Sequence, residues 1–238
     1  MESIANGLIQ ERISLYDEIC AFFTERQIIA INGTEPDRRL LTLSRPWTEG
    51  RCIIFNQSFR ESQSGTIQWL RANISFPVLI DETAELITSL IGQQSIRRLS
   101  CFDALERYTG IDPFTDQDCS EAAAHLGLEL HPDCEKWDRN TWLRFLFTHA
   151  VQSHLGQGEI SIVLDFPSSL FPENHFFKKE EDSVAEHFEI YFQGLEIAAG
   201  QRKSRPPIDE SFLASLKIPA PDLLSVSLNY SALSLFKN

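Results

Sequence analysis

Long apolar runs are absent from this 238-residue sequence, in which no stretch of 18 consecutive apolar residues occurs. A transmembrane helix is therefore not expected. The first ten residues include Glu2 and no basic residue, so they do not resemble a secretory signal peptide. Both absences favour a cytoplasmic protein that makes no contact with a membrane.

Cysteine is scarce and scattered, and the common glycine motifs of nucleotide sites are missing. The cysteines are odd in number and include no C-x-x-C pair, so neither a disulfide framework nor a zinc site is expected. No G-x-x-x-x-G-K-[ST] or G-x-G-x-x-G motif occurs, which argues against P-loop and dinucleotide-binding sites. The five cysteines, Cys20, Cys52, Cys101, Cys119 and Cys134, are best explained as reduced thiols.

An excess of basic residues is also missing. The sequence has 34 acidic and 21 basic residues, which gives a formal net charge of -13. An acidic surface repels phosphate backbones, so nonspecific binding of nucleic acid is disfavoured. Two short basic segments, Arg97 with Arg98 and residues 201–205, are open to two interpretations, a local basic patch or solvated loop charge.

The apolar content is ample for a packed core, because 42% of the residues are hydrophobic and 17 are Phe. Apolar residues at helical spacing predict helices, and short runs rich in β-branched and aromatic residues predict strands. Helices are expected at residues 3–26, 81–99, 101–108, 120–126, 138–151, 210–216 and 231–236, and strands at residues 27–31, 51–59, 68–74, 160–166, 188–192, 195–198 and 223–228. This order favours an α+β fold with one domain over residues 1–238 and a helical insert at about residues 81–155.

Five segments resemble, in the same order along the chain, the elongation factor P lysine ligases, which are truncated relatives of lysyl-tRNA synthetase. The segments are FNQSFRE at 55–61, FDALERYTGIDP at 102–113, DFPSS at 165–169, VAEHFEIYFQGLEIAAG at 184–200 and PIDESFLASL at 207–216. The first is similar to the motif-2 pattern F-x-x-x-F-R-x-E. The resemblance implies a class II aminoacyl-tRNA synthetase-like antiparallel sheet flanked by helices, a homodimer and no anticodon-binding domain.

The resemblance also implies an ATP-binding cleft, of which several positions are retained. Arg60 stands at the motif-2 arginine that holds the α-phosphate, and Glu61 follows it. Glu189 and Glu196 fall on the carboxylates that bind ATP and Mg²⁺, seven residues apart across a glycine turn, and Gly200 is retained near them. Inherited structural pairing explains Arg60, Glu189 and Glu196 equally well.

Other positions depart from the family pattern. In the lysine pocket, E-x-x-N-G-F-x-E, the asparagine is replaced by Ala199, the aromatic residue by Gln201 and the ammonium-binding glutamate by Lys203. Arg71 falls near the glutamate of N-P-E-F. In motif 3, Ala232 replaces the arginine that holds the γ-phosphate. Positive charge beside a substrate ammonium, and a lost phosphate clamp, both oppose lysine activation.

Two functions remain open on this evidence. The first is a degenerate, catalytically inactive paralog, a pseudoenzyme that needs no cofactor and acts by binding elongation factor P, an intact ligase paralog or a small ligand. The alternative is an active ATP-dependent ligase with altered substrate specificity, which uses ATP and Mg²⁺ and in which Lys203 and Arg71 suit an anionic substrate. Transfer RNA is not an expected partner of either.

Overall fold

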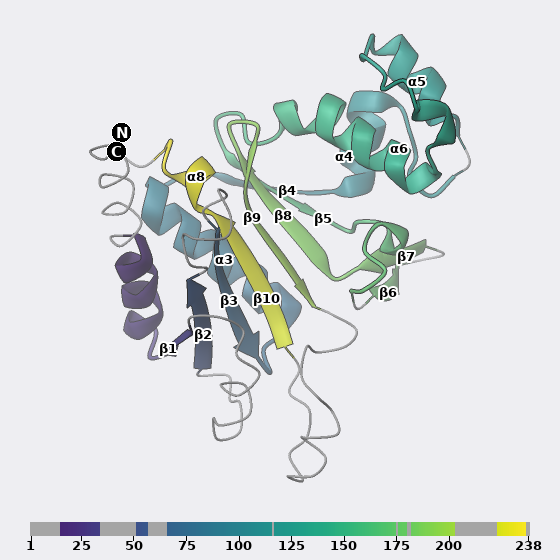
Figure 1. Ribbon diagram of the computed structural model, residues 1–238. Coiled ribbons are helices and arrows are strands. Elements are labelled where there is room, and N and C mark those ends of the chain that lie inside the picture. The colour runs from purple at the N-terminus through teal and green to yellow at the C-terminus, as the bar shows by residue number, and fades with distance from the viewer. Residues whose placement is uncertain are drawn as a thin grey trace, which may run out of the picture. The chain divides into compact units, whose positions relative to one another are not determined.

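The computed structural model describes residues 15–33, 51–56, 66–115, 117–174, 176–179, 182–202 and 223–236. The chain divides into two compact units (Figure 1). One contains residues 1–93 and 206–238, and the other contains residues 94–205. Both combine helices with mixed sheets, so the expected α+β class is confirmed. No helix in the described ranges is long and apolar enough to cross a membrane.

The sheet of the first unit contains four strands that the sequence predicts. It runs in the order β1 (Ile29–Gly33), β2 (Arg51–Asn56), β3 (Thr66–Ala72) and β10 (Leu223–Asn229). The pairing of β2 with β3 is antiparallel, and β10 is antiparallel to β3. β1 and β2 are parallel. The short helix α8 (Tyr230–Leu233) follows β10 directly.

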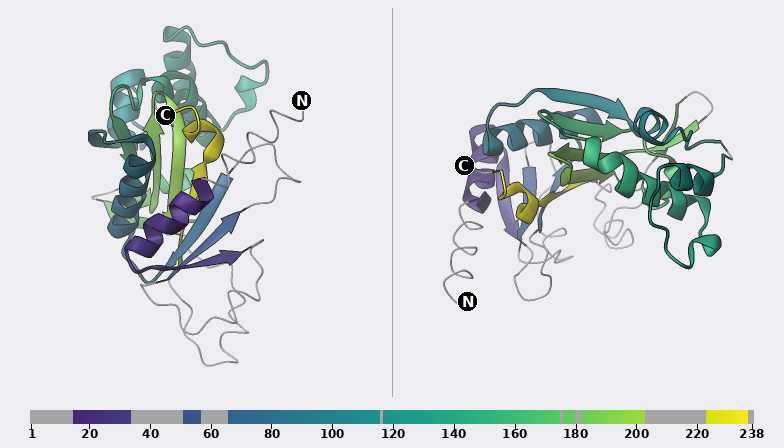
Figure 2. Two further views of the ribbon diagram at one scale, coloured as in Figure 1. Left: turned by 90° about the vertical axis from the view of Figure 1, so that its left-hand side faces the viewer. Right: turned by 90° about the horizontal axis from the view of Figure 1, so that it is seen from above.

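Two helices cover one face of β3 in this unit. Trp69 and Arg71 are two residues apart, so their side chains lie on the same face of the strand. Phe23, from the helical residues 15–25, contacts Trp69 edge to face with ring centroids 6.0 Å apart. Glu82, from α3 (Phe76–Ile91), reaches Arg71. Figure 2 shows the helix of residues 15–25 (purple) lying across these strands.

The helix expected at residues 81–99 is wrong at both ends. α3 begins at Phe76, because Ser75 caps it through a hydrogen bond from the Val78 amide and Pro77 suits the first turn. Gly92, with φ of 89°, ends the helix. Residues 96–100 then form strand β4 (Ile96–Ser100), which overlaps the last four residues of the region expected to be helical.

The sheet of the second unit runs in the order β9 (Leu195–Arg202), β8 (His187–Phe192), β5 (Ile160–Leu164) and β4. β8 is antiparallel to both β9 and β5, but β4 and β5 are parallel. The purely antiparallel sheet implied by the resemblance is therefore corrected to a mixed one. The connection from β4 to β5 passes through several helices, which is the long crossover that a parallel pair needs.

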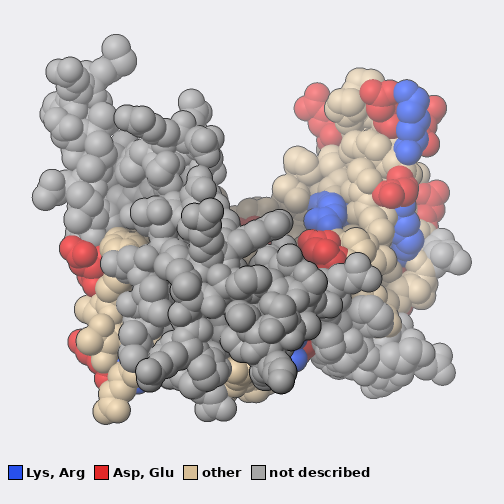
Figure 3. Space-filling model, turned by 60° about the horizontal axis from the view of Figure 1, so that its bottom comes forward, with Lys and Arg blue, Asp and Glu red and all other residues tan. Residues whose placement is uncertain are grey.

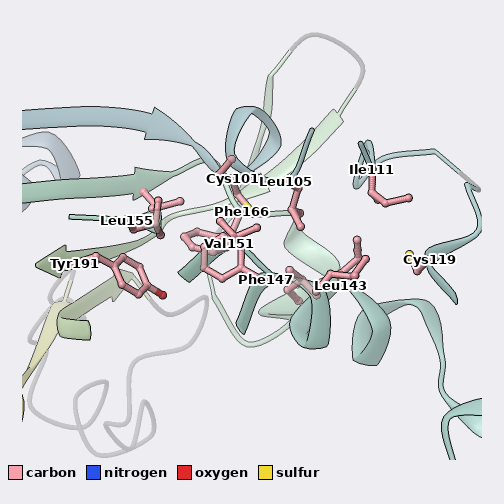
Figure 4. Packing of buried hydrophobic residues seen from close by; sticks show 14 of the residues in the cluster. Cys101, Leu105, Ile111, Cys119, Leu143, Phe147, Val151, Leu155, Phe166 and Tyr191 are labelled. Carbon is pink, nitrogen blue, oxygen red and sulfur yellow. The ribbon is translucent and has the colours of Figure 1, made fainter. Parts of the chain in front are cut away.

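Those connecting helices pack over the strands and form the core of the second unit. They are α4 (Cys101–Thr109), α5 (Cys119–His125), α6 (Arg139–Leu146), the π-helical turn η2 (Phe147–Val151) and the 3-10 turns η1 (Cys134–Lys136) and η3 (Gln152–His154). Buried apolar side chains join α4, α6 and η2 to β5 and β8 in one cluster. Figure 4 shows Tyr191 at one end of this cluster and Cys119 at the other.

A small hairpin completes the second unit. β6 (Phe176–Lys179) and β7 (Asp182–Ala185) are antiparallel, and they follow the 3-10 turn η4 (Ser168–Leu170). The resemblance segment at 165–169 leads into this turn. The helix expected at residues 210–216 lies outside the described residues.

Candidate functional site

A cavity of about 260 Å³ lies within the second unit, between the β8–β9 hairpin and the helices of the connection. Its polar lining consists of two carboxylates, one guanidinium, a phenol, a hydroxyl, an amide and a thiol. These belong to Glu189, Glu196, Arg144, Tyr191, Thr148, Gln152 and Cys101. The apolar lining consists of Leu105, Leu143, Phe147, Phe166, Leu170 and Phe171.

A bulge in the β8–β9 hairpin decides which side chains face this cavity. Glu189 pairs with Ala199 and Tyr191 pairs with Glu196, and the register shifts between these pairs so that Ile197 has no partner. Directly opposed residues of an antiparallel pair point to the same face. Glu196 and Ala199 are an odd number of residues apart, so they share a face only because of this bulge. The bulge thereby brings Glu196 beside Tyr191, on the face that carries Glu189.

Glu189 is held by its own strand. His187 Nε2 lies 3.1 Å from Glu189 Oε1, and Tyr191 Oη donates to Glu189 Oε2 at 2.6 Å. Residues 187, 189 and 191 alternate along one strand, so all three point to the same face. Burial, together with the charge of Glu189, raises the pKa of Tyr191, so its phenol stays a donor. The carboxylate of Glu189 is therefore fixed in orientation.

His187 links this carboxylate to the aromatic wall. The residue is 6% exposed and its ring stacks on Phe171 with centroids 3.8 Å apart. Its Nδ1 is buried and has no hydrogen-bond partner in the described part of the chain. Nε2 must carry a proton to donate to Glu189, because a carboxylate only accepts.

The side chain of Glu196 reaches solvent at the cavity wall. Its carboxyl group is nevertheless surrounded largely by protein atoms. This partial loss of water, followed by the charge of Glu189, raises the pKa of Glu196 to about 7. A nearby negative charge disfavours the ionised form of a carboxyl group. Glu196 therefore changes charge near neutral pH.

The Glu196→Gln variant is expected to gain stability relative to the parent protein as the pH rises from about 5 to about 8. A carboxyl whose pKa is raised from 4.5 to about 7 binds more protons in the folded state, so stability falls between those values as the pH rises. Glu196→Gln removes that loss. Melting temperatures of the variant and the parent across this pH range measure the difference in stability. Glu129→Gln, at an exposed position, is the control. Parallel curves for Glu196→Gln and parent would contradict the expectation.

The opposite wall carries Arg144, the one arginine among the described residues that line the cavity. Asp138 caps α6 by accepting from the Thr141 amide at 2.7 Å, and α6 leads into the π-helical turn that contributes Phe147 and Thr148. Arg144 donates to the Leu170 carbonyl, and its guanidinium carbon lies 5.0 Å from the centre of the Phe171 ring. The cavity thus has carboxylates on its sheet side and a guanidinium on its helix side.

The retained Gly200 has a structural reason to be glycine. Gly200 pairs with Phe188, on the face of the hairpin opposite to Glu189. A Cβ at this position would lie 2.2 Å from the ring of Phe188, which is fully buried. Gly200 therefore makes room for a core phenylalanine and does not belong to the cavity wall.

The replaced positions are distributed over both units. Ala199 and Gln201 pair with Glu189 and His187, on the cavity-facing side of the hairpin, but neither lines the cavity itself. Arg71 lies in the first unit, where its Nε donates to Glu82 Oε1 at 2.9 Å, with the two residues 3% and 8% exposed. This buried ion pair gives Arg71 a structural role.

Ala232 lies buried in α8, and its amide donates to the capping side chain of Asn229 at 3.1 Å. Arg60, Glu61 and Lys203 lie outside the described residues. Sequence reasoning passed over His187, Tyr191 and Arg144. The alternation of polar residues at 187, 189 and 191 was a usable signal for the first two, whereas no sequence pattern places Arg144 at the cavity.

The ligands available for a metal ion in the cavity are Glu189 and Glu196. No group of three or more His, Cys, Asp or Glu side chains that could hold a metal occurs among the described residues. Mg²⁺ typically takes one or two carboxylates together with substrate phosphates. The two glutamates therefore fit Mg²⁺ only as part of a nucleotide complex.

Charges of both signs are interspersed on the described surface of the second unit (Figure 3). On the face shown there, the described lysines and arginines lie next to acidic residues. The described part of this face therefore does not form a basic patch of one sign.

Curated proteins provide relatives for the chain, although no protein-family model matches it. An elongation factor P–(R)-β-lysine ligase of Yersinia enterocolitica is 30% identical over 217 residues, which cover 77% of this chain and 66% of the relative. The proteins of that name in Photorhabdus laumondii and Pectobacterium carotovorum are 30% and 29% identical and cover 77% and 74% of this chain, or 64% of each relative. The matched part thus spans slightly less than two thirds of these relatives.

Proposed function

The chain belongs to the elongation factor P lysine ligase family, and from this premise we propose that it is a degenerate member that no longer activates lysine and acts by binding. On this proposal it has a class II synthetase-like fold, is a cytoplasmic homodimer, and recognises elongation factor P, an intact ligase or a small ligand. The observation that supports the proposal best is that Glu189 and Glu196 line one cavity, whereas the sequence departs from the family pattern at positions 199, 201, 203 and 232.

The electrostatic change opposes lysine most strongly. By its place in the sequence, Lys203 stands where the family has a glutamate for the substrate ammonium. Replacing attraction by repulsion costs about 4 kcal/mol for each interaction at ~4 Å and an effective dielectric constant of ~20, before screening by water. A lysine substrate would then bind several decades more weakly than in an intact ligase.

The phosphate clamp is changed as well. Ala232, at the position of the motif-3 arginine, is a buried alanine inside α8. An alanine offers no charge to a γ-phosphate. Loss of one such arginine costs roughly 10³-fold or more in rate, by analogy with arginine fingers. Glu189 is also already oriented by His187 and Tyr191, which suits a fixed binding surface.

Lysine-dependent ATP–pyrophosphate exchange is expected to be at least about 10³-fold slower than that of the Yersinia enterocolitica relative assayed in parallel. The two lost contacts both stabilise the nucleotide and the acyl group during adenylate formation. Titration calorimetry with ATP and Mg²⁺ tests binding separately from turnover. Exchange with lysine or β-lysine at the rate of the intact relative would refute the proposal.

An active ligase with altered specificity is the second candidate. It is favoured by one observation, the presence of Glu189 and Glu196 on the same cavity, where Mg²⁺ and ATP could be held. Exchange assayed with every amino acid in turn distinguishes the two functions. A signal with a single amino acid other than lysine would establish this candidate, and silence with all of them would eliminate it.

A further inference from the structure

Helix α6 is fastened to the turn η4 by three hydrogen bonds. Asn140 Nδ2 donates to the Ser169 carbonyl at 3.0 Å, and Ser169 Oγ donates to Asn140 Oδ1 at 2.9 Å. Arg144 Nη2 donates to the carbonyl of the next residue, Leu170. Asn140 and Arg144 are four residues apart, so they lie on the same face of the helix. This face of α6 therefore fixes the backbone of η4 at two successive carbonyl groups.

The aromatic residue that follows η4 is fixed from the same helix. The guanidinium carbon of Arg144 lies 5.0 Å from the centre of the Phe171 ring, which is within the range of a cation–π contact. The Phe171 amide donates to the Ser168 carbonyl at 3.1 Å, and the Phe171 carbonyl accepts from the Asn174 amide at 3.0 Å. The backbone and the ring of Phe171 are thus both fixed, although the residue is only half-buried.

His187 depends on this ring for its orientation. The imidazole stacks on Phe171, with centroids 3.8 Å and planes 22° apart, and it meets Phe166 edge to face at 5.1 Å. Of its two nitrogens, Nε2 lies beside Glu189, whereas Nδ1 has no hydrogen-bond partner among the described residues. Rotation of a histidine ring about its Cβ–Cγ bond has no sharp preference of its own. The plane of the imidazole is therefore set largely by the two phenyl rings.

The series of contacts ends at a carboxylate of the cavity. His187 Nε2 lies 3.1 Å from Glu189 Oε1, and Glu189 lines the cavity. Rotation of the imidazole would move Nε2 away from Oε1. Tyr191, at Oε2, would then be the remaining hydrogen-bond donor to this carboxylate in the described part of the chain. The orientation of Glu189 therefore depends, through two stacked rings, on residues of α6.

We propose that Phe171 is a positioning residue for Glu189, and that α6 holds Phe171 in place through Asn140 and Arg144. The inference rests on the proposed function in one respect, since it takes the cavity lined by Glu189 as the binding site. It deepens that function by assigning the direction of a cavity carboxylate to a helix face that includes Asn140, a residue outside the cavity lining.

Nuclear magnetic resonance of the ligand-free protein at one fixed pH tests this assignment. Two side-chain protons report on the two oxygens of Glu189, the Nε2 proton of His187 and the Oη proton of Tyr191. Phe171→Ala is expected to speed exchange of the His187 proton with water about tenfold or more, because the imidazole loses its stacking partner and opens more often. It should also shift the resonance of the Tyr191 proton. Phe171→Tyr keeps the ring and is expected to restore most of the protection.

Asn140→Ala tests the contribution of the helix. Asn140 does not line the cavity, and its hydrogen bonds go to Ser169, so its loss should reach His187 through η4 and Phe171. Exchange of the His187 proton is expected to quicken about threefold, as for the loss of ordinary hydrogen bonds. Ser169→Ala removes one of the two bonds from the other side, so the double variant should show less than the combined effect of the single ones.

Phe145→Leu is the matched control. Phe145 is an aromatic residue of α6 whose ring contacts Trp137, Trp142 and His149, and the variant is expected to leave both protons unchanged. Unchanged exchange and an unchanged Tyr191 resonance in folded Phe171→Ala would overturn the assignment. If Phe171→Ala does not fold, an exchange rate in Asn140→Ala equal to that of Phe145→Leu would overturn it instead.

These measurements separate the inference from the proposed function, because they need neither a ligand nor turnover. Lysine-dependent pyrophosphate exchange in the parent would refute the loss of lysine activation, whatever Phe171 does. Unchanged proton exchange in the variants, with no pyrophosphate exchange in the parent, would refute only the positioning role of Phe171.

Discussion

Replacing Arg71 by alanine is expected to lower the free energy of unfolding by about 3–5 kcal/mol, because it leaves Glu82 as an uncompensated buried charge. Arg71 and Glu82 are 3% and 8% exposed, and the bond between them is 2.9 Å long. Burial already raises the pKa of Glu82, against the opposing effect of Arg71. Urea denaturation near pH 8, followed by circular dichroism, measures the loss.

Two controls isolate the buried charge. The double variant Arg71→Met with Glu82→Leu removes both charges at similar volume and is expected to recover most of the stability. Arg26→Ala breaks the exposed pair of Arg26 with Glu85, whose side chains are 38% and 62% exposed, and should cost less than about 1 kcal/mol. A loss in Arg71→Ala no larger than that of Arg26→Ala would show that the pair is not buried in solution.

Gly200→Ala is expected to destabilise the protein by about 1–3 kcal/mol, the usual cost of overpacking a core. The added methyl group would lie 2.2 Å from the ring of Phe188, which is itself fully buried. Thermal unfolding measures the effect.

A second substitution tests the cause of that loss. Phe188→Leu shortens the ring that the new methyl group meets, so the Gly200→Ala with Phe188→Leu variant should lose less than the sum of the two single variants. Ala199→Ser, on the opposite face, is the control for a change of similar size in the same strand. Additive losses in the double variant would indicate that Phe188 is not the obstacle.

Local pattern predicted most of the elements that are described. The β2–β3 hairpin, the strands on either side of Gly194, β10 and α4 follow from short-range periodicity and turn chemistry. Strand β4 was not predicted, because residues 96–100 continue the apolar spacing of α3. Gly92 was the one local signal that the helix ends before them. Its parallel pairing with β5 is a nonlocal contact that no local pattern encodes.

Some residues of the candidate site can likewise be predicted from local sequence, whereas others require the tertiary structure. Glu189 and Glu196 were found from a motif, and alternation along one strand would have added His187 and Tyr191. The position of Gly200 on the opposite face required the register of the hairpin, which its bulge shifts by one residue. For Arg71, the structure adds a buried pair with Glu82, a partner eleven positions away that only the packing of α3 identifies.

The sequence by itself determined the resemblance to the family, the α+β class and the residue types at positions 199, 201, 203 and 232, because these depend on which residue stands at which place in an ordered set of motifs. Only the tertiary structure decided that two glutamates and Arg144 line one cavity. The physical reason is that a bulge determines the face of β9 on which Glu196 lies. The packing of α6 within the second unit brings the guanidinium of Arg144 to the opposite wall. Both are consequences of contacts between segments far apart in the chain.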